Sequence, residues 1–204
     1  MDSLRLIVGL GNPGSEYALT RHNVGFMALE LLAERHQGGW KTEGRFESKV
    51  AWVTVRRRRV LCCEPQTFMN CSGRAVRGLS DFYKILDDRL LVVVDDADLP
   101  LGEVRMRKSG GSGGHHGLES VEQSGVGREY ARLRIGIGRQ PAGQVREITG
   151  HVLGRFQPEE QGILNRVLDR SVRQIECWAT DGPGKAMNDF NGAIEMDSPT
   201  EQES

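Results

Sequence analysis

A run of five aliphatic residues, LLVVV at positions 90–94, constrains the fold of this chain more than any other segment. A strand with one face in water alternates apolar and polar residues, whereas an uninterrupted apolar run suits a strand that is covered on both faces. The run leads directly into Asp95, which places a carboxylate at the carboxyl end of the expected strand. We therefore expect a central strand with helices packed on both sides of its sheet.

Shorter patterns supply the other layers of such a fold. Further strands are predicted at 4–8, 46–55, 60–63, 104–108 and 133–138. Helices are predicted at 22–35, 72–83, 118–123, 158–182 and 184–191. Ser72 is expected to cap the helix that it precedes. The mixture of strands and helices predicts a single three-layer α/β domain over residues 1–194, followed by a disordered acidic tail at 195–204.

Composition excludes several classes of protein. No apolar run reaches the roughly 18–20 residues that span a bilayer, and no basic, apolar leader precedes the first strand, so we expect a soluble, cytoplasmic protein. The four cysteines lack the spacing of a metal or redox motif and are expected to be buried free thiols. With five dispersed histidines, neither a metal nor a cofactor is expected.

The net charge of −1 hides an uneven distribution of charge along the chain. Residues 156–204 hold 4 Lys and Arg against 10 Asp and Glu, whereas residues 1–155 hold 23 against 18. The first part therefore carries +5 and the second −6. A basic body is joined to an acidic C-terminal part.

The stretch LIVGLGNPGSEY at 6–17 matches the glycine pattern of dinucleotide-binding loops. Such a site also needs a helix that starts at the third glycine, and an acidic residue about 20 positions later at the end of a second strand. Here the helix is expected only from His22, and Glu30 and Glu34 fall inside it. The loop is better interpreted as a strand exit whose glycines bring Asn12 and Tyr17 to a cleft.

Four polar residues, Asn12, His22, Asn70 and Asp95, follow expected strands or begin expected helices. Ligands of open α/β sheets bind beyond the carboxyl ends of the strands, so all four can face one cleft. Histidine accepts protons near pH 7, and an aspartate on its second ring nitrogen would orient it. Asn70 could then donate to an oxyanion, and Asn12 could bind the acyl group. Each residue alone could equally be a helix cap or a turn residue.

Four longer motifs carry a resemblance to a known family. IVGLGNPGSEYALTRHNVGF, PQTFMNCSG, VVVDDADLPLGEVRMRKSGGSGGHHGL and RLRIGIGRQ occur in the order and spacing of the bacterial-type peptidyl-tRNA hydrolases. The chain resembles this family from about Leu6 to Asn191. The resemblance implies a monomer with a mixed, largely parallel sheet. It also implies cleavage of the ester between a peptide and the 3′-terminal ribose of tRNA, which recycles tRNA after early ribosomal drop-off.

The resemblance also assigns roles to matching positions. His22 falls on the catalytic histidine of the family and Asp95 on the aspartate that holds it. Asn12 and Asn70 fall on asparagines that position substrate and water. Tyr17 and Phe68 fall on residues that line the cleft for the tRNA 3′ CCA end and its acyl group.

One motif departs from the family pattern. The chain has Gly114-His115-His116-Gly117 where the family has G-H-N-G, so His116 replaces an asparagine associated with water and the tRNA end. A neutral imidazole offers one donor and one acceptor, whereas an amide offers two donors and an acceptor. We expect His116 to keep the contact with an altered pH dependence.

The segment SGGSGGHHG at 109–117 is too rich in glycine for a helix or strand and is called the glycine-rich loop. Phosphate contacts of a tRNA are expected from two basic groups beside this loop, although each group could also be a solvated strand face. These groups are Arg105, Arg107 and Lys108, and Arg132, Arg134 and Arg139. The run Arg56 to Arg59 is interpreted as a solvated hairpin turn. A non-catalytic RNA-binding member of the same fold is the alternative function, and the presence of all four polar cleft residues favours the enzyme.

Overall fold

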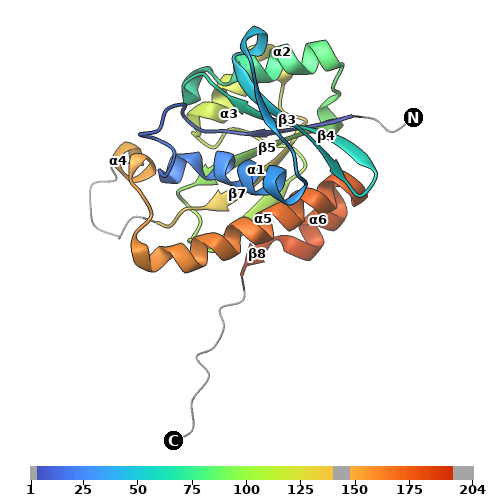
Figure 1. Cartoon of the computed structure of the whole chain (residues 1–204). Coiled ribbons are helices and arrows are strands. Elements are labelled where there is room, and N and C mark those ends of the chain that lie inside the picture. The colour runs from blue at the N-terminus through green and yellow to red at the C-terminus, as the bar shows by residue number, and fades with distance from the viewer. Residues whose placement is uncertain (1–3, 140–147, 195–204) are drawn as a thin grey trace, which may run out of the picture.

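The computed structural model describes residues 4–139 and 148–194, and the acidic tail expected at 195–204 lies outside them. The described strands form one sheet in the order β2-β3-β4-β1-β5-β7-β6-β8, with helices on both faces (Figure 1). The strands are β1 (Arg5–Gly9), β2 (Trp40–Glu43), β3 (Ser48–Val55), β4 (Arg58–Pro65), β5 (Leu90–Asp96), β6 (Glu103–Arg107), β7 (Ala131–Gly136) and β8 (Gly192–Ala193). The helices are α1 (Val24–Arg35), α2 (Gly73–Tyr83), α3 (His116–Val121), α4 (Ile148–Leu153), α5 (Gln161–Asp181) and α6 (Pro183–Phe190).

The sheet is mixed, as expected, but its parallel part is confined to the centre. β1 lies parallel to β4 on one side and to β5 on the other, and β5 lies parallel to β7. The outer pairings β2–β3, β3–β4, β6–β7 and β6–β8 are antiparallel. The prediction of a largely parallel sheet is therefore correct for the four central strands and wrong for the edges. At one edge the antiparallel pairing follows from the tight turn at Arg56 and Arg57, which joins β3 directly to β4.

The aliphatic run in β5 is buried on both faces, which confirms its prediction as a central strand. Leu91 and Val93 pack into a core formed with α1 and α5. Leu90, Val92 and Val94 pack into a second core with α2 and α3. Figure 1 shows the corresponding layers, with α1 and α5 in front of the sheet and α2 and α3 behind its upper part. None of the described helices is long and apolar enough to cross a membrane.

The glycines after β1 allow the start of α1 to lie directly against the strand. A Cβ atom on Gly9 would lie 2.4 Å from the backbone oxygen of Gly25, and one on Gly11 would lie 2.9 Å from the ring of Phe26. The backbone N–H of Leu10 donates to the carbonyl of Val93, 2.9 Å away. This close approach brings the start of α1 to the carboxyl end of β5, as the interpretation of this loop as a strand exit requires.

Two local predictions need correction. Ser72 precedes α2, but its backbone is already helical, and its buried Oγ has no hydrogen-bond partner within residues 4–139 and 148–194, so it does not cap the helix. Cys62 and Cys63 are buried free thiols as expected, and burial raises the pKa of Cys63 to about 12. Cys71 and Cys177 are free but only partly buried.

The short elements β2, β8 and α4 were not predicted, because their few residues carry no clear periodicity.

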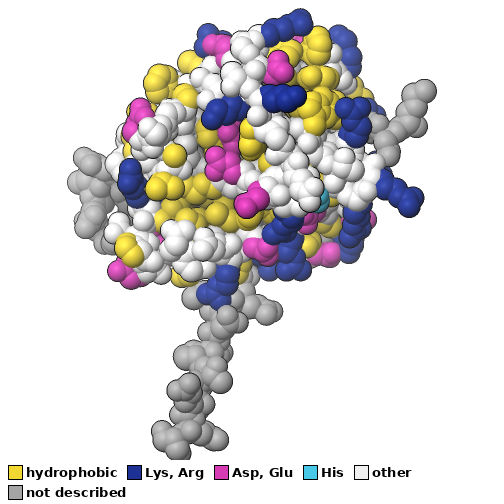
Figure 2. Space-filling view, in the orientation of Figure 1, with side chains coloured by type: hydrophobic (Ala, Val, Ile, Leu, Met, Phe, Trp, Pro, Cys, Tyr) yellow, Lys and Arg dark blue, Asp and Glu magenta, His cyan; other side chains and the backbone are white. Residues whose placement is uncertain are grey.

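The arginine-rich turn behaves as a solvated hairpin. β3 and β4 pair in antiparallel register up to Val55 and Arg58, which leaves Arg56 and Arg57 as the exposed turn. Figure 2 shows Lys and Arg side chains along the upper and right-hand parts of this face, with Asp and Glu side chains among them.

One carboxyl group in the sheet is buried without a full set of partners. Glu64 in β4 is 3% exposed, and its Oε1 has no hydrogen-bond partner among the described residues. Burial is the largest cause that raises the pKa of Glu64; the nearby Glu30 also raises it, Lys49 lowers it, and the net result is a pKa of about 8. A pKa in this range favours the protonated carboxyl group at pH 7.

The raised pKa of Glu64 predicts a pH-dependent stability. The folded state binds one more proton than the unfolded state between about pH 4.3 and pH 8, so the free energy of unfolding falls as the pH rises through this range. At about 1.4 kcal/mol per pKa unit the loss is on the order of 4 kcal/mol at pH 8. Glu64→Gln should remove most of this fall in urea-unfolding series, whereas Glu43→Gln at an exposed site should keep it. Parallel pH curves for wild type and Glu64→Gln would contradict the prediction.

Candidate active site

The structure brings His22 and Asp95 into direct contact. His22 lies in a 3₁₀ turn, Arg21–Asn23, between the β1 exit and α1, and Asp95 lies near the carboxyl end of β5. His22 Nδ1 is 2.7 Å from Asp95 Oδ1. The side chains are 12% and 3% exposed, respectively. The predicted base and its predicted orienting carboxylate therefore form a hydrogen-bonded pair at the edge of the central strand.

A second imidazole, to which the sequence analysis assigned no catalytic role, contacts the same carboxylate. His115 Nε2 is 3.0 Å from Asp95 Oδ1. Its Nδ1 accepts hydrogen bonds from the backbone N–H groups of Gly117 and Leu118, at 3.1 and 3.3 Å, and so caps α3. Because Nδ1 accepts, the proton of neutral His115 resides on Nε2, where it is donated to Asp95. The available signal was the position of His115 three residues before the expected helix at 118–123, whose observed start is at His116.

These two imidazoles determine the ionisation of Asp95. Burial by itself would raise the pKa of the carboxyl group, but the neighbouring His22 and His115 outweigh it and hold the pKa well below its ordinary range. The ionised carboxylate can only accept hydrogen bonds, so His22 Nδ1 must donate. The Nε2 lone pair of neutral His22 is thereby left to accept a proton from a substrate or a water molecule.

Asn12 is buried beside this pair in a fixed orientation. Its Oδ1 accepts from the backbone N–H of Met69, 2.8 Å away. Asn23 pairs with both backbone groups of Asn12, at 2.9 Å each, although the sequence analysis did not single out Asn23. The amide Nδ2 of Asn12 is consequently the group that can donate to a ligand.

The other predicted cleft residues flank Met69. Phe68 and Asn70 are its neighbours in the chain, and both are exposed. The rings of Phe68 and Tyr17 meet edge to face, with centroids 6.5 Å apart and planes at 89°. Met69 thus links Asn12 to the chain segment that carries Phe68 and Asn70, and Phe68 in turn contacts the half-buried Tyr17.

His116 does not join the cluster around Asp95. Its side chain is 76% exposed, and its Nδ1 lies 3.1 Å from Glu119 Oε2 on the next turn of α3. The two adjacent histidines therefore have different surroundings: His115 is buried against Asp95, whereas His116 faces solvent.

The ligand atoms of His22, Asp95 and His115 lie within 4.8 Å of one another, a spacing that could hold a metal ion. However, the two ring nitrogens that face Asp95 carry the protons of its hydrogen bonds. A cation would have to displace both protons. The hydrogen-bonded arrangement therefore accounts for the cluster by itself.

The predicted phosphate-binding arginines divide into two kinds. Arg105 and Arg107 are exposed on β6, and Arg105 lies 3.1 Å from Glu103. Their partners in register on β7 are Arg134 and Arg132. Both β7 arginines donate to carbonyl groups of the glycine-rich loop. Arg132 is buried and donates to the Gly111 carbonyl.

The guanidinium of Arg134 is likewise bonded to groups within the protein. It donates to the Ser112 carbonyl, 2.7 Å away, and lies 3.3 Å from Asp96 Oδ2. Its side chain is mostly buried. The geometry therefore favours Arg134 as a support for the glycine-rich loop. Of the other predicted arginines, Arg105 and Arg107 are exposed on β6, and Arg139 is exposed but donates to the Asp98 carbonyl.

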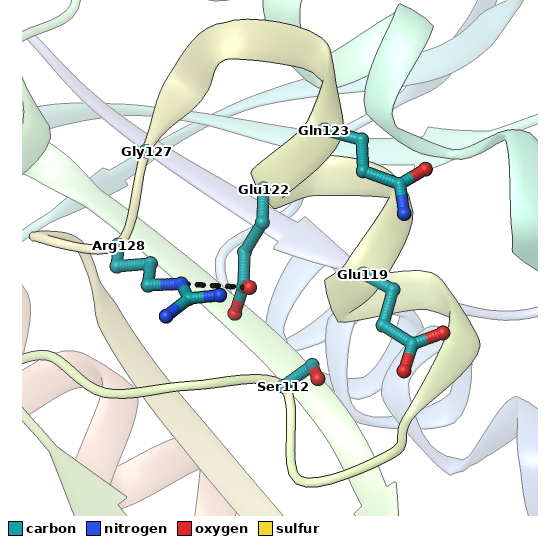
Figure 3. Close-up of a pocket in the computed structure, with 6 residues that line it drawn as sticks. All are labelled: Ser112, Glu119, Glu122, Gln123, Gly127 and Arg128. Carbon is teal, nitrogen blue, oxygen red and sulfur yellow. Dashed lines mark hydrogen bonds and ion pairs between the residues drawn. The ribbon is translucent and has the colours of Figure 1, made fainter.

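A pocket of about 670 Å³ lies on the outer side of α3. In Figure 3 the Arg128 guanidinium meets Glu122, 2.9 Å away, while Glu119 and Gln123 point away from that pair. None of the predicted catalytic residues lines this pocket, which makes it distinct from the His22–Asp95 site. Its lining residues are Ser112, Glu119, Glu122, Gln123, Gly127 and Arg128.

A three-layer α/β fold with an imidazole–carboxylate pair and amide side chains beyond its parallel strands defines the class of this protein as an enzyme equipped for hydrolysis. The sequence model of one family, peptidyl-tRNA hydrolase, matches residues 6–199. The chain belongs to the peptidyl-tRNA hydrolase family.

Individual relatives agree with this assignment. The chain is 44% identical over 188 residues to a peptidyl-tRNA hydrolase of Syntrophomonas wolfei, covering 92% of this chain and 100% of the relative. It is 46% identical to one of Synechococcus sp. (strain JA-3-3Ab), covering 98% and 88%. The crystal structure of peptidyl-tRNA hydrolase from Acinetobacter baumannii superposes with a TM-score of 0.87 at 36% identity, covering 95% of this chain and 97% of that one.

The double role of His115 predicts a clear difference between the adjacent histidines. His115→Ala removes a helix cap and a hydrogen bond to a buried carboxylate, so the free energy of unfolding should fall by about 2 kcal/mol. His116→Ala, at the neighbouring exposed position, should change it by less than about 0.5 kcal/mol. Denaturant unfolding at pH 7 measures both values. Equal losses in the two variants would exclude this account of His115.

Proposed function

We propose that this chain hydrolyses the ester between a peptide, or another N-blocked aminoacyl group, and the 3′-terminal ribose of tRNA. The observation that carries the proposal is the hydrogen bond between His22 Nδ1 and the ionised Asp95, in a member of this family. Among the described residues this bond leaves the other ring nitrogen of His22, Nε2, available to a substrate. The reaction would return free tRNA to translation in the cytoplasm after premature ribosomal drop-off.

The first step is attack by water. His22 Nε2 accepts a proton from a water molecule as the water oxygen bonds to the ester carbonyl carbon, and a positioned base of this kind contributes about 10²–10⁴ in rate. The imidazolium that forms is stabilised by Asp95. Asp95 need not take up a proton itself, because its carboxylate already accepts from two imidazoles.

Amide donors stabilise the tetrahedral intermediate. Asn70 donates to the oxyanion, and the open Nδ2 of Asn12 donates to the acyl portion of the substrate. When the intermediate collapses, the bond to the ribose oxygen breaks and His22 returns its proton to that oxygen. No protein nucleophile is required, and the nearby Ser72 is unsuited to the role because its Oγ is buried.

The surroundings of the cleft suit the two ends of the substrate. The exposed ring of Phe68 and the half-buried ring of Tyr17 offer apolar and stacking surfaces to the CCA end and the acyl group. Arg105 and Arg107 lie where phosphates of the acceptor stem can be contacted, and Arg134 supports the glycine-rich loop beside them. The exposed His116 is available to the tRNA end. All these groups come from one chain, so a monomer suffices.

Substitution of the proposed base tests the function directly. Wild type should release the acyl amino acid from N-acetyl-aminoacyl-tRNA but not from unblocked aminoacyl-tRNA. His22→Ala should lower kcat by about 10²–10⁴. The matched control is His36→Ala, which removes another carboxylate-bonded imidazole, paired with Glu176 at 2.9 Å, away from the cleft. No turnover by wild type would favour a non-catalytic RNA-binding protein.

The proposed contact between Arg107 and a tRNA phosphate predicts that this residue contributes to the salt dependence of tRNA binding. Arg107→Ala should weaken tRNA binding and reduce the slope of log K against log salt by about 1, because one phosphate contact is lost. Arg57→Ala removes an equally exposed arginine from the distant β3–β4 turn and should leave the slope unchanged. Filter binding from 50 to 300 mM salt gives both slopes. An unchanged slope for Arg107→Ala would show that Arg107 does not contact a tRNA phosphate.

A further inference from the structure

We propose that Arg21 is a positioning residue that sets the geometry of the His22–Asp95 pair, an inference that rests on the proposed function. Arg21 immediately precedes His22 and is only 8% exposed, which is unusual for an arginine. Its guanidinium Nη1 donates to the carbonyl of Ile137, 2.8 Å away. This carbonyl follows β7, the strand beside β5 in the sheet.

The contacts of Arg21 close a ring around the catalytic pair. The backbone N–H of Ile137, on the residue that Arg21 holds, donates to the carbonyl of Asp96, 3.2 Å away. Asp96 is bonded to Asp95, Asp95 accepts from His22, and His22 is bonded to Arg21. The ring therefore contains both the proposed base and its carboxylate partner, so a shift of Arg21 changes their separation.

An ion pair fixes the guanidinium in this ring. Arg21 binds both carboxylate oxygens of Glu160, at 2.6 and 3.1 Å, and stacks over the ring of Phe156 at 4.7 Å. Partial burial would raise the pKa of Glu160, but the hydrogen bonds from Arg21 and from the Gln157 backbone outweigh it and leave the pKa below its ordinary value. The planar fork of arginine makes this bidentate contact, which a lysine cannot reproduce.

The backbone of the same turn is anchored as well. The N–H of Arg21 donates to the carbonyl of Gly154, 2.9 Å away, and Thr20 forms an isolated bridge with Arg155. Arg21 is thus held through its main chain and its side chain by segments outside α1. Because displacement of a catalytic group by about 1 Å can cost about 10² in rate, this anchoring bears directly on kcat.

The test compares Arg21→Lys and Glu160→Gln with a matched control, Arg35→Lys. Arg35 also forms ion pairs with α5, through Asp169 and Glu176, and neither of these described partners belongs to the ring around His22. We expect Arg21→Lys to lower kcat by about 10-fold to 10²-fold with KM within about twofold of wild type. Glu160→Gln should give a smaller loss of the same kind, and Arg35→Lys should keep the wild-type kcat.

A spectroscopic readout separates this inference from the proposed function. The His22 Nδ1 proton that is donated to Asp95 should give a downfield ¹H NMR signal, which disappears in His22→Ala. In Arg21→Lys and Glu160→Gln this signal should shift or broaden, whether or not the protein turns over the tRNA ester. If the proposed function is wrong, the wild type will not turn over the tRNA ester, but its His22 Nδ1 proton signal will still change when Arg21 is replaced.

Several outcomes would overturn the proposal. These are an unchanged signal and kcat in Arg21→Lys, a change confined to KM, or equal losses in Arg21→Lys and Arg35→Lys. If Arg21→Lys does not fold, Glu160→Gln decides, because it keeps the arginine and alters only its carboxylate partner. A wild-type kcat and signal in that variant would then exclude a positioning role for the ion pair.

Discussion

The buried carboxylate of Asp95 is the constraint on which the rest of the site depends. An isolated charge in a protein interior is costly, so it must be met by strong hydrogen-bond donors. Both observed donors are imidazoles, and they come from different parts of the chain: His22 from the exit of β1 and His115 from the start of α3. Satisfying one carboxylate therefore requires the first loop and the glycine-rich loop to meet at the end of β5.

The central part of this arrangement could be predicted from the sequence because it follows from strong, local patterns. The aliphatic run at 90–94 identifies the central strand, and Asp95 follows it immediately. Parallel neighbours then bring Asn12 and His22 to the same edge. The antiparallel edges were harder to anticipate, because short strands such as β2 and β8 are defined by their pairing partners more than by their own residues.

The residues that sequence reasoning missed act through contacts that spacing does not encode. Asn23 matters because it pairs with the backbone of Asn12, and Arg21 because it meets Glu160, 139 positions later. The same limitation explains why the exposed arginines could not be told from the buried ones in the sequence. The alternation of residues along β7 does not indicate which guanidinium group donates to a loop carbonyl. Arg132 is taken by the Gly111 carbonyl, although in sequence it resembles the exposed Arg107.

Hydrogen bonding, more than residue type, selects which histidine can serve as the base. The backbone N–H groups of α3 occupy Nδ1 of His115, so its proton lies on Nε2 and is directed at Asp95. His22 donates to the same oxygen through Nδ1, so the opposite tautomer is imposed on it. His115 thus has both ring nitrogens engaged, and His22 retains one open lone pair. Two histidines share one carboxylate, yet only His22 keeps the capacity to remove a proton from water.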